Sequence, residues 1–202
     1  MPQDSSFTIK NLIVKKRGIT ILKQKYFVWP KKSLCLLTGD NGSGKTTLLR
    51  VLTSRAHYEG SISHSYKNIV YMPVDYWNDL PDTVTTNDLL ALFNHHSIKV
   101  PSFFNKSISN LSSGEKQVAG CYYSVIQKPD CLICDEPFAH LDTATRYYLI
   151  SFLKNISKQI NVIVSGHLSA SWFKEFSLVL HLDNKSLHVC SADNTDCNNI
   201  QV

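Results

Sequence analysis

The fold of this chain is decided by residues 39–47, which read Gly39-Asp40-Asn41-Gly42-Ser43-Gly44-Lys45-Thr46-Thr47. They satisfy every fixed position of the phosphate-binding pattern G-x-x-x-x-G-K-[ST]. The apolar residues 34–38 before them predict a buried strand, and residues 46–52 predict the start of an amphipathic helix. A glycine loop between a strand and a helix binds anions, because free backbone N–H groups and the helix dipole point at the phosphates. Lys45 can then reach the β- and γ-phosphates of a nucleotide, and the Thr46 hydroxyl can bind Mg²⁺.

The remaining patterns predict an α/β fold. Strands alternate with helices after residue 34, which predicts a mostly parallel sheet flanked by helices, the arrangement of a P-loop NTPase. The early strands predict an attached antiparallel β layer. We expect one domain over residues 1–202, with a small helical subdomain at about 75–127 and a polar tail at 191–202. The predicted strands are 7–14, 19–22, 26–29, 34–38, 59–63, 68–72, 131–134, 162–165, 178–182 and 187–190, and the predicted helices are 46–52, 85–94, 112–127, 143–158 and 170–175.

Composition and charge limit the possible partners and locations. The net charge of +5 is spread too thinly along the 202 residues to indicate nucleic-acid binding. No apolar run reaches the roughly 18 residues of a membrane-spanning helix, and the N-terminus does not have the form of a signal peptide. These features predict a cytosolic protein. Cys131 and Cys134 form a C-x-x-C inside an apolar strand pattern, which favours a buried core over a metal or redox site.

A second candidate site follows the predicted strand at 131–134, where Asp135 and Glu136 stand side by side. A parallel sheet places ligand groups at the carboxyl ends of its strands, so these acids should lie beside the glycine loop. Asp135 could hold Mg²⁺, directly or through water. Glu136 could orient and deprotonate an attacking water molecule.

With both sites in view, the chain resembles an ATP-binding-cassette (ABC) ATPase subunit. Leu111-Ser112-Ser113-Gly114-Glu115 is similar to the family signature L-S-G-G-Q, and the motifs that follow it come in the family's order. Asp135-Glu136-Pro137 matches the acidic strand end, Leu141-Asp142 matches the D-loop, and His167 matches the switch histidine. The resemblance covers about residues 7–190.

The resemblance implies ATP and Mg²⁺ as ligands and ATP hydrolysis as the activity. It implies a head-to-tail dimer, of identical or different ATPase subunits, with two ATP molecules in the interface. Lys45, Thr46, Asp135, Glu136 and His167 would act from one subunit, and Ser112 and Gly114 would touch the γ-phosphate from the other. The family's ATPase subunits work at the cytoplasmic face of a membrane on a separate integral permease.

Within the family, the chain is most similar to the ATP-binding subunit of heme exporters in cytochrome c biogenesis. The features that support this subgroup are the short length, residues 41–50, and Asp135-Glu136-Pro137-Phe138. Heme export is therefore the transport function that this resemblance implies.

The sequence departs from the family pattern at three places. Lys16 and Arg17 stand where the family usually has an aromatic residue that stacks on adenine, although a guanidinium can also stack on a base. Val74 stands where the family has the Q-loop glutamine, and Asp75 could replace that residue with a shift of one position. In the signature, Ser113 replaces the second glycine and Glu115 replaces the glutamine, and Glu115 is expected to add negative charge near the triphosphate.

Three functions remain open on these observations. The first is an ATP-driven motor for a membrane transporter. The second is a soluble ABC ATPase acting on ribosomes or DNA, although such relatives usually carry two cassettes or a long coiled-coil insertion. The third is a regulator that binds ATP and barely hydrolyses it, which Val74 favours and the retained Glu136 and His167 oppose.

Overall fold

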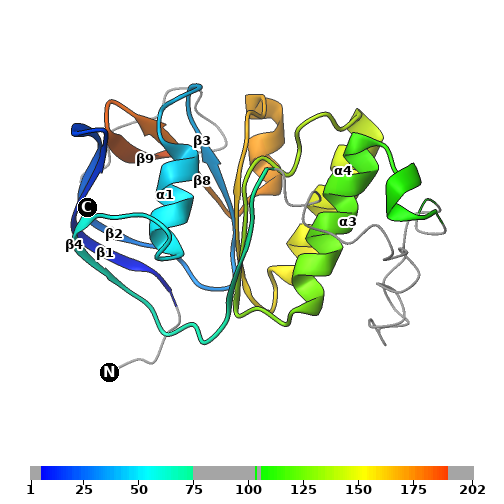
Figure 1. Cartoon of the computed structure of the whole chain (residues 1–202), viewed down its shortest axis with the longest axis horizontal. Helices are drawn as coiled ribbons and strands as arrows, with labels where there is room; N and C mark the ends of the chain where they lie inside the picture. Colours follow the sequence, from blue (N-terminus) through cyan, green and yellow to red (C-terminus); the bar gives the residue numbers. More distant parts are fainter. Residues whose placement is uncertain (1–5, 75–102, 104–105, 191–202) are drawn as a thin grey trace.

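A central six-stranded sheet organises the protein, as the computed structural model shows for residues 6–74, 103 and 106–190. The strand order is β5-β6-β7-β3-β8-β9, in which the first five strands are parallel and β9 pairs antiparallel with β8 (Figure 1). The strand bounds are β3 Leu34–Thr38, β5 Ile69–Met72, β6 Cys131–Cys134, β7 Asn161–Ser165, β8 Leu178–Asp183 and β9 Ser186–Cys190. This arrangement confirms the predicted parallel sheet.

A second, antiparallel sheet has the order β2-β1-β4 and confirms the predicted β layer. Its strands are β1 Thr8–Lys16, β2 Ile19–Val28 and β4 Glu59–Ser63. The prediction of two short strands at 19–22 and 26–29 was wrong, because β2 is one strand that pairs with β1 along its whole length. Gly60 has a φ of +95° and lies so close to β1 that a Cβ there would be 2.2 Å from the Asn11 carbonyl oxygen.

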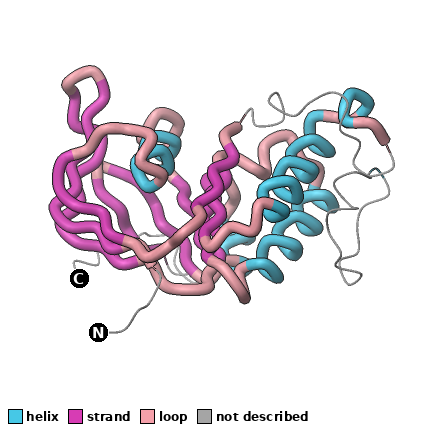
Figure 2. Tube along the Cα trace, turned by 60° about the horizontal axis from the view of Figure 1, so that its bottom comes forward, coloured by secondary structure: helices cyan, strands magenta, loops and turns pink. Residues whose placement is uncertain are grey.

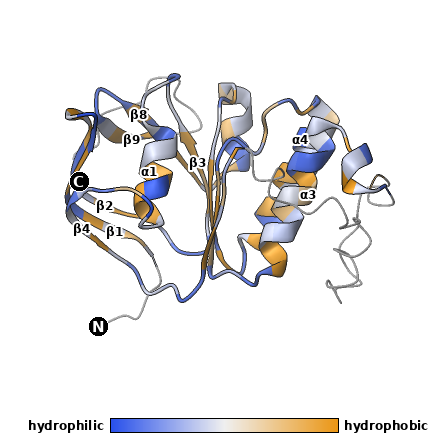
Figure 3. Ribbon diagram, in the orientation of Figure 1, coloured by the Kyte–Doolittle hydropathy of each residue, from blue (hydrophilic) through white to orange (hydrophobic). Residues whose placement is uncertain are grey.

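Helices cover both faces of the central sheet. Helix α1 (Lys45–Leu52) lies between the two sheets, where Leu48 and Leu49 pack in one core with Leu12, Leu22 and Leu37. Helices α3 (Ser113–Ile126) and α4 (Thr143–Ile156) cover the opposite face. Figures 1 and 2 show this layering, and Figure 3 shows that α3 and α4 carry both hydrophobic and hydrophilic residues.

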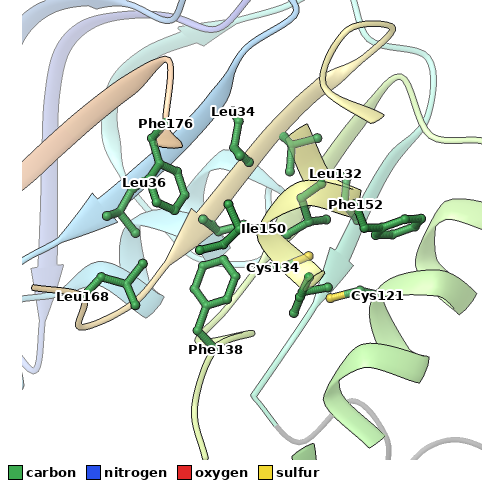
Figure 4. Packing of buried hydrophobic residues seen from close by; sticks show 14 of the residues in the cluster. Leu34, Leu36, Cys121, Leu132, Cys134, Phe138, Ile150, Phe152, Leu168 and Phe176 are labelled. Atoms are coloured by element: carbon green, nitrogen blue, oxygen red, sulfur yellow. The ribbon is translucent and has the colours of Figure 1, made fainter. Parts of the chain in front are cut away.

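Alternate residues of the central strands supply the two cores. Leu34 and Leu36 of β3 face α3 and α4, whereas Cys35 and Leu37 face α1. Cys131 and Cys134 are fully buried in β6, as expected of core residues. In Figure 4, Leu132 and Cys134 lie in the core with Ile150 of α4 and Cys121 of α3.

Two short 3₁₀ helices complete the described elements, η3 Ile108–Asn110 and η4 Ala170–Glu175. Helix η4 confirms the short helix predicted at 170–175. The helix predicted at 85–94, most of the predicted subdomain at 75–127 and the tail at 191–202 lie outside the described residues. Within the described part of the chain, no helix has the length and apolar character needed to cross a membrane.

Candidate functional site

The glycine loop leaves the carboxyl end of β3 and leads directly into α1. Gly39 has a φ of +145°, and a Cβ there would be 2.5 Å from the Leu182 carbonyl oxygen, so only glycine fits. Gly44, with a φ of +111°, precedes the first helical residue, Lys45. The loop therefore has the strand–loop–helix context that the sequence predicted, with the N-terminus of α1 behind it.

Lys45 is almost buried, with 6% of its surface exposed. Its ammonium donates to the carbonyl oxygens of Gly39 (2.8 Å) and Asp40 (3.1 Å) and lies 3.0 Å from His167 Nε2. Burial lowers the pKa of the Lys45 ammonium, while the carboxylates of Glu136, Asp135 and Asp40 act in the opposite direction. A protonated Lys45 makes Nε2 of His167 an acceptor, which places the imidazole proton on Nδ1.

Asp135 follows β6 and is 1% exposed. Its Oδ1 accepts a hydrogen bond from Ser165 Oγ at 2.6 Å, and its Oδ2 accepts one from the Tyr71 hydroxyl at 3.2 Å. Burial, reinforced by the Asp135 charge, raises the pKa of Tyr71 to about 12, so Tyr71 stays a donor at neutral pH. Both carboxylate oxygens of Asp135 are therefore held by neutral hydroxyl donors.

Glu136 and His167 lie at the ends of neighbouring strands and approach each other. Glu136 Oε1 is 3.7 Å from His167 Nε2. A cavity of about 240 Å³ separates the glycine loop from Glu136 and provides space for a ligand. Its lining residues are Lys16, Ile21, Asn41, Gly42, Gly44, Lys45, Thr46, Thr47 and Glu136.

The predicted site residues lie in two separate groups, one around Lys45 and one at the start of α3. The first group lies at the carboxyl ends of β3, β6 and β7 and contains Lys45, Asp135, Glu136 and His167. Thr46 and Thr47 line the cavity of about 240 Å³ together with Lys45 and Glu136. Asp40 and Ser43 line an adjacent cavity of about 380 Å³ that they share with Asn41 and Gly42.

The loop fits a phosphate, and the acids fit a magnesium ion. Ser43 Oγ is buried and has no hydrogen-bond partner among the residues that the structure describes, so a phosphate oxygen would satisfy it. Hydroxyl and carboxylate oxygens are the protein ligands that Mg²⁺ prefers, and Thr46 and Asp135 supply them.

Ser112 and Gly114 form the second group, at the start of α3 on the opposite face of the sheet from α1 (Figure 1). Ser112 caps α3 by accepting from the Glu115 N–H at 3.2 Å, and Glu115 accepts from the Ser112 N–H at 2.8 Å. The two hydrogen bonds together form a capping box. Neither Ser112 nor Gly114 lines the cavity beside Lys45.

The described part of the chain includes three of the residues that depart from the family pattern, Lys16, Val74 and Glu115. Lys16 lines the cavity beside the glycine loop. Val74 is 43% exposed, and its carbonyl oxygen accepts a hydrogen bond from Gln117 Nε2 at 3.0 Å. Glu115 forms an ion pair with Lys106 at 2.8 Å, which offsets the extra negative charge expected at this helix end. Asp75 lies outside the described residues.

Two residues of the site, Ser165 and Tyr71, were not predicted from the sequence; both donate hydrogen bonds to Asp135. Ser165 carried a detectable signal, because it is a polar residue at the carboxyl end of an apolar strand. Tyr71 carried none, because an aromatic residue in a buried strand is ordinary core material.

Comparisons with known proteins agree with this geometry. The family model described as "ABC transporter" matches residues 22–139. The "Probable metal transport system ATP-binding protein" of Thermotoga maritima is 31% identical over 199 residues, covering 89% of this chain and 82% of the relative. The "Zinc import ATP-binding protein ZnuC" of Rickettsia prowazekii is 31% identical over 169 residues, covering 77% of this chain and 72% of the relative.

Solved structures show the same fold. The cbiO1 protein of Clostridium perfringens, part of the ABC transporter complex cbiONQ, has a TM-score of 0.75 at 20% identity, covering 91% of this chain and 87% of that one. A nucleotide-free ATP-binding cassette from an ABC transporter has a TM-score of 0.72 at 15% identity, covering 91% and 89%. The chain belongs to the ABC transporter family, as a subunit that binds and hydrolyses ATP.

Proposed function

We propose that this chain drives the import of a metal ion through a separate membrane permease. The similarity to relatives named for metal transport and zinc import carries this proposal, because it extends over most of both chains. The two curated relatives compared above are not named for heme, so heme export, which the sequence motifs suggested, has no support from them.

The proposed chemistry assigns one task to each group at the carboxyl ends of the strands. The glycine loop and Lys45 bind the β- and γ-phosphates of ATP, because Gly42, Gly44 and Lys45 line one cavity at the N-terminus of α1. Thr46 and Asp135 hold Mg²⁺, which neutralises charge that develops on the phosphates. Asp135 has both oxygens already hydrogen-bonded, which favours binding through a water molecule.

Glu136 is the proposed general base. Its carboxylate lies at the wall of the same cavity and can accept a proton from a water molecule that attacks the γ-phosphate. His167 Nε2 lies 3.0 Å from Lys45 Nζ and 3.7 Å from Glu136 Oε1. Once the Lys45 ammonium turns to the phosphates, a proton on Nε2 would let His167 donate to the γ-phosphate and hold it against the base. A chain that binds ATP without hydrolysing it has no need of this arrangement, which argues against a purely regulatory role.

The proposed working form is a head-to-tail dimer of ATPase subunits, identical or different. Ser112 and Gly114 start a helix on the far face of the sheet and do not line the cavity beside Lys45, which supports their action on a nucleotide held by a second subunit. There the N–H groups at the start of α3 would meet the γ-phosphate. The dimer would dock from the cytoplasmic face onto an integral permease subunit.

Transport measurements test the metal-import proposal. The chain is purified together with its permease, reconstituted into liposomes, and supplied with ATP on the side of the ATPase. We expect ATP-dependent movement of a divalent transition metal such as Zn²⁺ toward that side, and only leakage with the Glu136→Gln variant. If heme moves in an ATP-dependent manner and no transition metal does, the metal-import proposal is wrong and the heme-export interpretation is restored.

A further inference from the structure

Ser165 connects the two acids of the site through one hydroxyl group. It is the last residue of β7 and is fully buried. Its Oγ donates to Asp135 Oδ1 at 2.6 Å and accepts from the Glu136 N–H at 2.9 Å. The hydroxyl uses its only proton on Asp135, so the direction of both hydrogen bonds is fixed.

The topology places Ser165 between the parts of the site. Strand β7 lies between β6, which ends at the two acids, and β3, which leads into the glycine loop. Ser165 pairs with Leu37 of β3, and His167 follows two residues later, 3.7 Å from Glu136. Ser165 therefore ends the strand that leads to His167, and its hydroxyl is hydrogen-bonded to the two acids that follow β6.

The backbone of Glu136 needs such support. Glu136 has a φ of +53°, a left-handed conformation that is unfavourable for a residue with a Cβ and persists only where surrounding contacts hold it. The hydrogen bond from Glu136 N–H to Ser165 Oγ is one of those contacts, and the bond from Ala139 N–H to the Glu136 carbonyl oxygen is another. Loss of the serine hydroxyl would leave the Glu136 N–H without its acceptor.

We infer that Ser165 is a positioning residue that fixes the Asp135 carboxylate and the Glu136 backbone relative to each other. The inference rests on the proposed roles of Asp135 in holding Mg²⁺ and of Glu136 as the base. Without the hydroxyl, Asp135 loses one of its two donors and can rotate, while Glu136 can relax toward an ordinary backbone conformation. We therefore expect a lower kcat and weaker binding of Mg²⁺. ATP binding should be little changed, because Lys45 is held by other partners, Gly39, Asp40 and His167.

The Ser165→Ala variant tests the inference, with Ser124→Ala as a matched control. Ser124 is also fully buried, and its hydroxyl donates to the Gly120 carbonyl oxygen at 2.8 Å within α3. Both variants remove one buried hydroxyl, but only Ser165 touches the acids. We expect Ser165→Ala to lower kcat about ten- to a hundredfold, the effect of one lost hydrogen bond to a charged group, and to raise the Mg²⁺ concentration needed for half-maximal rate. We expect the affinity for ATP measured by calorimetry to stay within about twofold of wild type.

A hydroxyl-keeping variant separates positioning from packing. Ser165→Thr retains the donor and acceptor, and threonine is well accommodated in strands. We expect Ser165→Thr to be faster than Ser165→Ala and to need less Mg²⁺. The inference is overturned if Ser165→Ala matches Ser124→Ala in both kcat and Mg²⁺ dependence, or if Ser165→Thr binds ATP normally and is no faster than Ser165→Ala. Glu136→Gln, measured alongside, tests the proposed base separately: a wild-type rate there would contradict the proposed function itself.

Discussion

Replacement of Glu136 by glutamine is expected to leave ATP binding intact and to stop hydrolysis almost completely. Glutamine keeps the shape of glutamate but cannot take a proton from water, and a positioned base contributes about a hundred- to ten-thousandfold to such a reaction. The glycine loop and Lys45 are unchanged in this variant, so the phosphates still bind. Bound ATP that is not hydrolysed should hold two subunits together.

The measurements are phosphate release, ATP affinity and the dimer fraction in size-exclusion chromatography with ATP. Glu175→Gln is the matched control, because Glu175 and Glu136 have nearly the same side-chain exposure, 26% and 25%. Glu175 forms an ion pair with Lys154 and does not line the cavity beside Lys45. A Glu136→Gln protein that releases phosphate as fast as Glu175→Gln would show that another group is the base.

Replacement of Lys45 by alanine is expected to abolish ATP binding at micromolar concentrations. Two charge-assisted hydrogen bonds from the ammonium to the β- and γ-phosphates are worth about 1.5–3 kcal/mol each, so their loss weakens binding about a hundred- to ten-thousandfold. The variant also leaves the Gly39 and Asp40 carbonyl oxygens without the donor that they share in the wild type. Both effects act on the glycine loop itself.

Isothermal titration calorimetry with ATP and Mg²⁺ measures this loss directly. Lys154→Ala serves as the control, because it removes an equal charge from a half-exposed side chain on α4. We expect wild-type affinity in the control and no measurable heat of binding for Lys45→Ala. An unchanged affinity for Lys45→Ala would mean that ATP does not bind at the glycine loop.

The sequence predicted the parts of the fold that depend on local patterns. The strand at Leu34–Thr38, apolar except for its last residue, and the wholly apolar strand at Cys131–Cys134 are short and buried, so their sequences alone distinguish them from loops. The capping box of Ser112 and Glu115 is likewise a local pattern with a local structural result. The two strands position Lys45, Asp135 and Glu136.

The single strand β2 could not be predicted in the same way. The polar residues Lys23, Gln24 and Lys25 interrupt its apolar pattern and suggested a break. They continue the strand because β1 provides hydrogen-bonding partners along the whole length of β2, and this pairing is a tertiary contact. Sequence periodicity contains no information about such a partner.

Contacts between side chains of different strands were also out of reach. The approach of Lys45 Nζ to His167 Nε2 joins residues 122 positions apart, and the bond between Ser165 and Asp135 joins residues 30 positions apart. Parallel strands place ligand groups at their carboxyl ends, and on this basis the sequence predicted that these groups would lie close together. It could not predict that a serine would bridge the acids, because that depends on the order β6-β7-β3 in the sheet.

Two chains combine, in the proposed dimer, to make each site of ATP hydrolysis, and mixing two inactive variants tests this arrangement. In the proposed dimer, Lys45→Ala would disable the glycine loop of its own chain, and Ser112→Arg would disable the signature that the chain offers to its partner. A mixed dimer would contain one site with both defects and one intact site, made of Lys45 from one subunit and Ser112 from the other. The measurement is the rate of phosphate release for each variant alone and for an equimolar mixture. We predict no activity from either variant alone and clear activity from the mixture, and a mixture no more active than its parents would contradict the head-to-tail dimer.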